Sequence, residues 1–335
     1  GAALAVKSRA LLYAASPLNN PSNDQAKWQK ASDAAKAVID LNIYSLFADY
    51  KSMFLASNIY NSEMIWQRPF NNLVDYELGW EIAFYPAGSN GRAQTTPLHN
   101  LVDDYETLNG LQPEDDPDYD PQDPYVNRDP RFYASILYEG ATFKGRTIEV
   151  YIPGGIDGDQ PPTGTTTPRT GYYTRKFIDE SITDPIQTRI GNSPWTFFRY
   201  AEILLNYAEA QYFLGNEGVA RQYLNMVRKR PGVDMPDVTE SGPDLLKRIQ
   251  NERRIELAFE GHRYHDVRRW KIAMDVLNVN AKKMQVTLDP VTSEKTYTVT
   301  DLLPARGFNE RNYLLPIPQS EIERNKNMEQ NPGYN

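Results

Sequence analysis

The stretch Asp244–Lys271, DLLKRIQNERRIELAFEGHRYHDVRRWK, decides the fold of this chain. Its first half places apolar residues at a spacing that keeps them on one face of a helix: Leu245, Leu246, Ile249 and Leu257. Pro243 and Asp244 suit a first turn, because proline needs no donor there and a carboxylate favours the helix N-terminus. The sequence therefore predicts a helix from about Asp244, a turn at Gly261 and a second, shorter helix.

The same stretch carries more charge than one solvent-facing side can hold. Ile255, Ala258 and Phe259 form a second apolar face, so part of the charge must lie away from water. A buried charge needs a partner, and guanidinium groups bind carboxylates through two parallel hydrogen bonds. We therefore predict a buried structural network of ion pairs made by Glu252, Arg253, Glu256, Glu260, Arg263, Asp266, Arg268 and Arg269.

Helical hairpins are expected in two further parts of the chain. Residues 1–42 predict two helices separated by Ser16-Pro17, the second with small residues on one face. The segment from Phe198 to Gly232 predicts two more, and its length is close to the roughly 34-residue tetratricopeptide period. An ordinary helical hairpin fits that segment equally well. We expect residues 1–42 and 194–277 to form a helical-repeat scaffold, because a lone helical pair cannot bury both of its faces.

Residues 43–193 and 278–335 predict long loops, since aromatic residues there are interrupted by proline and asparagine. A short helix is expected from Leu98 to Tyr105. Short strands are expected at Phe132–Leu137, Thr147–Ile152, Tyr172–Phe177, Gln285–Leu288 and Tyr297–Val299. The expected fold class is therefore mainly α, with tetratricopeptide-like helical pairs, large irregular loops and a few short β-strands in one domain spanning residues 1–335.

Composition excludes several classes of function. A net charge of −8 argues against a nucleic-acid surface, which needs a basic patch. The absence of cysteine excludes disulfides, thiolate metal sites and a cysteine nucleophile. No apolar run in the sequence approaches the length of a membrane span. Tyrosine is abundant, with 22 residues, and its ring and hydroxyl suit sugars and interfaces, although we expect most of these tyrosines in the core.

Two groups of residues resemble metal sites only superficially. His262 and His265 lack the i, i+4 spacing of a zinc-binding helix, so a structural role is expected for them. We expect a solvated acidic loop around residues 114–123, with calcium as the alternative at Asp115, Asp116, Asp118 and Asp120. No nucleophile elbow, phosphate loop or histidine-rich set indicates catalysis. We therefore expect no cofactor and no enzymatic activity.

The run NERRIELAFEGHRYHDVRRWK resembles the C-terminal signature of the SusD/RagB family, the surface glycan-binding lipoproteins of Bacteroidetes-type bacteria. Five more segments resemble the family and occur in its order: GAALAVKSRALLYAASP, NLVDDYETLNG, YDPQDPYVNRDPRFYASILY, PWTFFRYAEILLNYAEA and LLPIPQSEIERNKNMEQNPGY. His265 departs from the pattern, since the family usually has an aromatic residue there. The chain starts at Gly1 inside a helical pattern, so we interpret it as a fragment without its export signal, lipidated cysteine and first helical repeat.

The resemblance implies a binding role at the cell surface. Members of this family resemble a lid over a SusC-type TonB-dependent transporter of the outer membrane, to which they pass an oligosaccharide. The lipid anchor, expected outside this chain, is then the only link to the membrane. Two alternatives remain open. One is a scaffold that binds a peptide or protein, including a peptide nutrient, and the other is a glycoside hydrolase, which needs two carboxylates at a defined separation.

Candidate ligand contacts follow from the chemistry of sugars. Sugar C–H faces pack on aromatic rings, and sugar hydroxyls need amide and charged partners. The loop residues that offer these groups are Trp66, Asn71, Asn72, Tyr76, Trp80, Arg92, Tyr119 and Tyr125. For each of them a place in the core is the competing interpretation. The resemblance assigns no specific contact, because these loops vary within the family.

Overall fold

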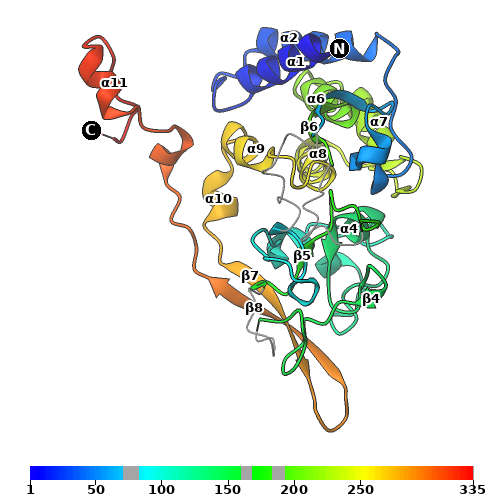
Figure 1. Cartoon of the computed structure of the whole chain (residues 1–335). Coiled ribbons are helices and arrows are strands. Elements are labelled where there is room, and N and C mark those ends of the chain that lie inside the picture. The colour runs from blue at the N-terminus through cyan, green and yellow to red at the C-terminus, as the bar shows by residue number, and fades with distance from the viewer. Residues whose placement is uncertain (71–82, 160–167, 183–192, 335) are drawn as a thin grey trace.

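The computed structural model describes residues 1–70, 83–159, 168–182 and 193–334. Helices gather at one end of the molecule, the hairpin β7–β8 projects at the other end, and the C-terminal segment with α11 stands apart from the body (Figure 1). Over the described residues the structure is mainly helical, and each of its sheets has two strands. The expected mainly α fold class is therefore confirmed.

Helix α6 is the centre of the helical end. Its residues from Tyr200 to Gln211 are all buried, because α1 and α2 pack on it from one side and α7 and α8 from the other. The five helices are α1 (Ala2–Ala15), α2 (Gln25–Ile39), α6 (Tyr200–Phe213), α7 (Glu217–Arg228) and α8 (Gly242–Glu256). Both helical hairpins predicted from the periodicity are present, and each hairpin contributes a face to one shared core.

The stretch Asp244–Lys271 forms most of α8, a turn and the short helix α9 (Arg263–Arg269), and a further short helix, α10 (Ala273–Leu277), follows it. Phe259 and Gly261 both take left-handed backbone conformations, so the chain turns sharply after α8, as Gly261 predicted. The one shorter helix predicted after Gly261 is divided into α9 and α10.

The sheets are small and antiparallel. They pair β1 (Met64–Arg68) with β6 (Trp195–Arg199), β2 (Ile136–Leu137) with β5 (Tyr173–Thr174), β3 (Thr142–Phe143) with β4 (Arg146–Thr147), and β7 (Ala281–Leu288) with β8 (Lys295–Leu303). The remaining described helices are α3 (His99–Val102), α4 (Pro130–Ser135), α11 (Gln319–Arg324) and the 3-10 turns Ser52–Phe54, Ala56–Asn58, Ala87–Ser89, Pro113–Asp115 and Glu310–Tyr313.

The prediction of a strand at Phe132–Leu137 is wrong for most of that segment. Its first residues lie in helix α4, because Pro130 occupies the first turn and the Asp129 carboxylate caps the helix by accepting from the Arg131 amide at 2.8 Å. Only Ile136 and Leu137 form a strand. The cap and the proline outweigh the alternating pattern of the segment.

Other predicted elements differ in length. The strand predicted at Thr147–Ile152 ends at Thr147, because the amides of Val150 and Tyr151 donate to the Glu139 carboxylate and not to a strand. The strand predicted at Tyr172–Phe177 shortens to β5, and the helix predicted at Leu98–Tyr105 shortens to α3. Strands β7 and β8 contain the two C-terminal predictions and extend beyond both.

Two main cores hold the molecule together. One lies between the helices, with Leu204, Leu224 and Ile249 fully buried, and the other lies among the loops around Phe132 and Tyr172. None of the helices in the described part of the chain is both long and apolar enough to cross a bilayer.

Candidate functional site

A network of buried ion pairs joins α8 to the loops. The Glu256 carboxylate accepts from Arg131 at 2.9 Å and from Arg199 and Arg230 at 2.6 Å each, and all four side chains are buried. Glu252, one turn earlier on α8, pairs with Arg131 and with Arg228 at 3.0 Å. Two glutamates four residues apart on α8 therefore bind arginines that belong to α4, to β6, and to the end of α7 and the residues just after it.

The network continues past the turn after α8. Glu260 accepts from Arg199 and from Lys176, both at 2.8 Å. Burial by itself would raise the pKa of Glu260, but the charges of Arg199 and Lys176 outweigh it and lower the pKa to about 2. Glu260 is therefore ionised throughout the physiological range.

A second part of the network joins α8, α9 and α6. The Asp266 carboxylate accepts from Arg253 and Arg269 at 2.8 Å each. Burial would raise the pKa of Asp266, and these two guanidinium groups lower it to about 2. Arg269 also pairs with Glu209 of α6 at Oε2, 2.8 Å away. Six of the eight predicted network members, Glu252, Arg253, Glu256, Glu260, Asp266 and Arg269, therefore lie in the network.

Two predicted members lie outside the network. Arg268 stacks on the Tyr264 ring, 3.6 Å from its guanidinium carbon to the ring centroid, and donates to the Tyr264 carbonyl. The Arg263 side chain makes no hydrogen bond or ion pair with any residue that the structure describes. The network also contains residues that were not predicted from the sequence: Glu63, Glu106, Asp129, Arg131, Lys176, Arg199, Glu209, Arg228 and Arg230. For Arg199 a signal existed, since it interrupts the apolar run WTFFRYAEILL.

The network leaves little capacity for a ligand. Its carboxylates and guanidinium groups already bind one another, and they lie out of reach of solvent. A ligand would have to break these pairs at a cost of several kcal/mol. The site must therefore be sought at the surface.

A hollow of about 430 Å³ opens in the acidic loop, and we call it the acidic groove. Its polar wall consists of Asn109, Asp116, Asp118, Tyr119, Asp120, Asp123 and Asn127. The loop is held in place by Arg128, which is buried and donates to the carbonyls of Val102, Tyr105 and Pro124. Leu108 donates from its amide to the Asn127 carbonyl at 2.7 Å and so closes the base of the loop.

The acidic groove combines an aromatic ring with polar groups. Tyr119 is partly exposed, its ring lies 5.7 Å from the Arg128 guanidinium carbon, and burial raises the pKa of its hydroxyl. The hydroxyl is therefore a donor at neutral pH. The carboxylates of Asp118, Asp120 and Asp123 are exposed and supply acceptors, and Asn127 supplies both kinds of group. An aromatic face next to mixed donors and acceptors is the chemistry that sugar recognition needs.

The calcium alternative receives no support from this geometry. Asp116 is committed to Thr107, to the Asn109 amide at 3.1 Å and to the Asp118 backbone amide at 2.9 Å. Across the described residues, no three or more histidine or acidic side chains converge as a metal site would require. Asp115 is exposed and does not line the groove, so the four predicted aspartates are not brought together.

The other predicted ligand residues lie apart from Tyr119. Trp66 is 45% exposed on β1, and its ring lies 4.9 Å from that of Phe197 on the paired strand, so the two form an aromatic surface. Arg92 is exposed and does not line the groove. Tyr125 is a core residue, with its ring 4.4 Å from Tyr138, and this corrects its place among the candidates. Asn71, Asn72, Tyr76 and Trp80 lie outside the described residues.

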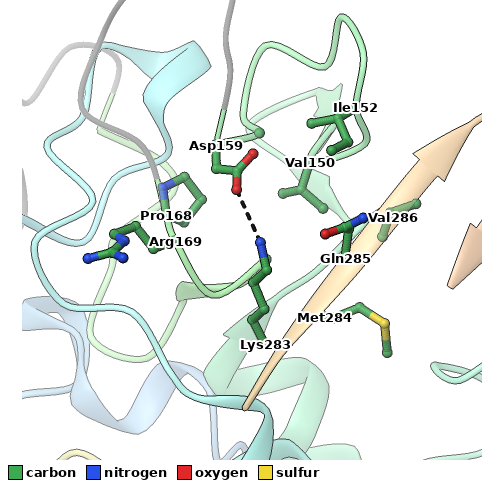
Figure 2. A pocket seen from close by; sticks show the side chains of 11 residues that line it. Val150, Ile152, Asp159, Pro168, Arg169, Lys283, Met284, Gln285 and Val286 are labelled. Carbon is green, nitrogen blue, oxygen red and sulfur yellow. Dashed lines mark hydrogen bonds and ion pairs between the residues drawn. The ribbon is translucent and has the colours of Figure 1, made fainter. Parts of the chain in front are cut away.

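A pocket under β7 is too small for a ligand. Figure 2 shows its walls, where Lys283 points toward Asp159 and donates to it at 3.3 Å, with Val150, Ile152 and Val286 beside them. The space between the described walls is about 10 Å³, which is room for roughly one water molecule.

Comparison with known proteins identifies the family. The model of the SusD family matches residues 59–334. The chain belongs to the SusD family. The resemblance inferred from the sequence segments is therefore confirmed for most of the length of this SusD-family chain.

Three relatives show how far the similarity extends. A SusD-like protein from Bacteroides fragilis NCTC 9343 superposes with a TM-score of 0.80 at 31% identity, over 99% of this chain and 65% of that protein. A SusD-like carbohydrate binding protein from the same strain gives 0.77 at 29% identity, over 98% and 64%. SusD-like protein P25 of Formosa agariphila is 24% identical over 90% of this chain and 54% of that protein. The chain thus spans about half to two thirds of the length of these relatives.

Proposed function

We propose that this SusD-family chain is part of a cell-surface protein that captures an oligosaccharide and passes it to a SusC-type TonB-dependent transporter. The observation that carries the proposal is the acidic groove, where the Tyr119 ring meets carboxylates and amides around a hollow of about 430 Å³. That volume lies in the range of small-ligand sites. Family membership supports the proposal, as does the solved relative that is named a carbohydrate binding protein.

The division of labour within the chain is part of the proposal. Residues 1–42 and 194–277 act as the rigid scaffold, and the loops of residues 43–193 and 278–335 face the ligand and the transporter. The buried ion pairs hold the two parts in register, because Arg131 from the loops binds Glu252 and Glu256 from the scaffold. A lipid anchor would hold the protein at the outer membrane.

We further propose binding without catalysis. The network carboxylates are buried and held by arginines, so Glu252 and Glu256 cannot exchange protons with a sugar. Hydrolysis would require a general acid and a second carboxylate on either side of the bond to be cut. The function proposed here needs neither a cofactor nor covalent chemistry.

One observation favours the alternative of peptide capture. A second hollow, of about 500 Å³, has mainly apolar walls that include Tyr50, Pro130, Tyr133 and Val233. Apolar walls suit side chains of a peptide better than the hydroxyls of a sugar. Peptides therefore belong in the binding test beside glycans.

The test is calorimetric titration of the protein with a panel of oligosaccharides and peptides. We expect saturable binding of a glycan with no shorter sugar released. Tyr119→Ala should weaken it about tenfold or more, equivalent to roughly 1.4 kcal/mol. Tyr60→Ala is the matched control, because Tyr60 is 67% exposed and does not line the groove.

Three results would count against the proposal in different ways. If Trp66→Ala abolished binding and Tyr119→Ala left it unchanged, the ligand site would lie at the Trp66–Phe197 surface. Binding of peptides and of no glycan would favour peptide capture. Appearance of shorter sugars would overturn the non-enzymatic role.

A further inference from the structure

Three arginines line a hollow that is separate from the acidic groove. The hollow measures about 340 Å³ and lies between α3, the turn after α8, α10 and the start of β7. Arg254, Arg263 and Arg306 line it, and most of the remaining wall is apolar, including Leu98, Leu101 and Leu277. We call it the arginine pocket.

Positive charge in the arginine pocket exceeds negative charge. Arg254 pairs with Asp104 and donates to the Asn100 carbonyl at 2.8 Å. Burial raises the pKa of Asp104 to about 6, and the charge of Arg254 only partly opposes this. Asp103, the neighbouring carboxylate, is engaged by His99 of α3 at 3.0 Å. The lining contains three guanidinium groups and no carboxylate, and Arg306 is exposed without an ion pair in the described chain.

Arg263 is an exception among the arginines of this structure. The fully buried arginines that are described donate to carboxylates, as Arg131 and Arg253 do, or to three carbonyls, as Arg128 does. Arg263 is half-buried and makes no such bond with any described residue. Burial, together with the nearby charge of Arg254, lowers the pKa of Arg263 to about 10. A half-buried guanidinium with no acceptor in the described protein is free to donate to an anion in the pocket.

We propose that the arginine pocket binds a carboxylate ligand with an apolar body. The carboxylate binds Arg263 and Arg254, and the body packs on Leu98, Leu101 and Leu277. A carboxylate matches the planar fork of a guanidinium. The volume of about 340 Å³ admits a small molecule. The site goes beyond the proposed glycan capture, because it shares no lining residue with the acidic groove.

The test compares a carboxylate with an apolar body and a carboxylate with a hydroxylated body. Calorimetric titration at low salt uses hexanoate for a free alkyl carboxylate and methyl galacturonoside for an acidic sugar, with hexanol as the uncharged control. We expect hexanoate to bind saturably and hexanol not to bind. Binding of the galacturonoside in place of hexanoate would overturn the proposal, because a body of hydroxyl groups does not match the apolar wall.

The variants make the assignment specific. Arg263→Gln should weaken carboxylate binding at least about tenfold. Arg268→Gln should leave it unchanged, because Arg268 is on the same helix but stacks on Tyr264. Tyr119→Ala should also leave it unchanged, so that failure of this proposal is distinguishable from failure of glycan capture. Carboxylate binding that survives Arg263→Gln, or no carboxylate binding at all, would overturn the proposal.

A second measurement needs no ligand. Without a bound anion, Arg263→Gln removes a half-buried charge that has no ion-pair partner in the described chain and lies near the like charge of Arg254, so the melting temperature should stay the same or rise. A fall of several degrees would show that Arg263 already has a partner in the protein, and would overturn the proposal on its own.

Discussion

Glu260→Gln is the sharpest test of the buried network. The two carboxylate oxygens of Glu260 accept hydrogen bonds from Arg199 Nε, Arg199 Nη2 and Lys176 Nζ, each at 2.8 Å, and the Glu260 side chain is 3% exposed. Glutamine keeps the size of the side chain but removes its charge, so Arg199 and Lys176 each lose an anionic partner. The protein should therefore be destabilised without losing its shape.

The magnitude follows from the pKa of Glu260. It falls from a usual value of 4.5 to about 2, and each unit corresponds to about 1.4 kcal/mol, so the ionised carboxylate stabilises the fold by roughly 3 kcal/mol at pH 7. The folded pKa lies below the unfolded one, so this stability is present above about pH 4.5 and is lost as the pH falls toward 2. Burial lowers the pKa of Lys176 to about 8, so leaving this ammonium without its carboxylate is costly as well.

The assay is urea unfolding of wild type and variant between pH 7 and pH 3.5. We expect a loss of about 3 kcal/mol at pH 7 that shrinks below pH 4.5. Glu321→Gln is the matched control, because Glu321 pairs with Arg324 at 3.2 Å on the exposed helix α11, and it should cost less than about 0.5 kcal/mol. A loss below about 1 kcal/mol for Glu260→Gln, or one that does not change with pH, would refute the reasoning.

Two further predictions concern the backbone and a histidine. Gly171 and Gly140 both have positive φ, but a Cβ at Gly171 would overlap the Met284 carbonyl oxygen, whereas one at Gly140 meets nothing within 4 Å. In urea unfolding, Gly171→Ala should therefore cost at least about 2 kcal/mol more than Gly140→Ala, and equal losses would contradict the packing of β7 on this turn. Burial lowers the pKa of His262 to about 4, and the charge of Glu202 only partly offsets this effect. The imidazole NMR signals of His262 should therefore not shift between pH 8 and pH 5.5. A midpoint near 6.5 would show that His262 is exposed.

Local patterns identified most of the helices. The apolar spacing in residues 1–42, 198–232 and 244–257 is a property of each segment, so α1, α2, α6, α7 and α8 were predictable from the sequence. The segment at Phe132–Leu137 failed for a local reason as well, since the Asp129 cap and Pro130 select a helix there. The turn at Gly261 was predictable because few other residues tolerate its backbone conformation.

The candidate site was predictable only in part. Tyr119 and Tyr125 lie six residues apart in one acidic, proline-rich loop, and their surroundings in the sequence are alike. The fold directs Tyr119 to the groove and Tyr125 into the core against Tyr138. The difference depends on Arg128, which draws three carbonyls of the loop together. The sequence around each tyrosine carries no sign of that contact.

The sequence by itself determined the family, the helical class and the requirement that the charges of Glu252–Arg269 be paired. These follow from segment composition and periodicity, and from the high cost of a buried unpaired charge. Only the tertiary structure decided which partners satisfy that requirement. Glu252 pairs with Arg131, far away along the chain, and Arg263 is left facing a pocket. Partner choice is a property of three-dimensional packing, because an ion pair depends on distance in space and not on separation along the chain.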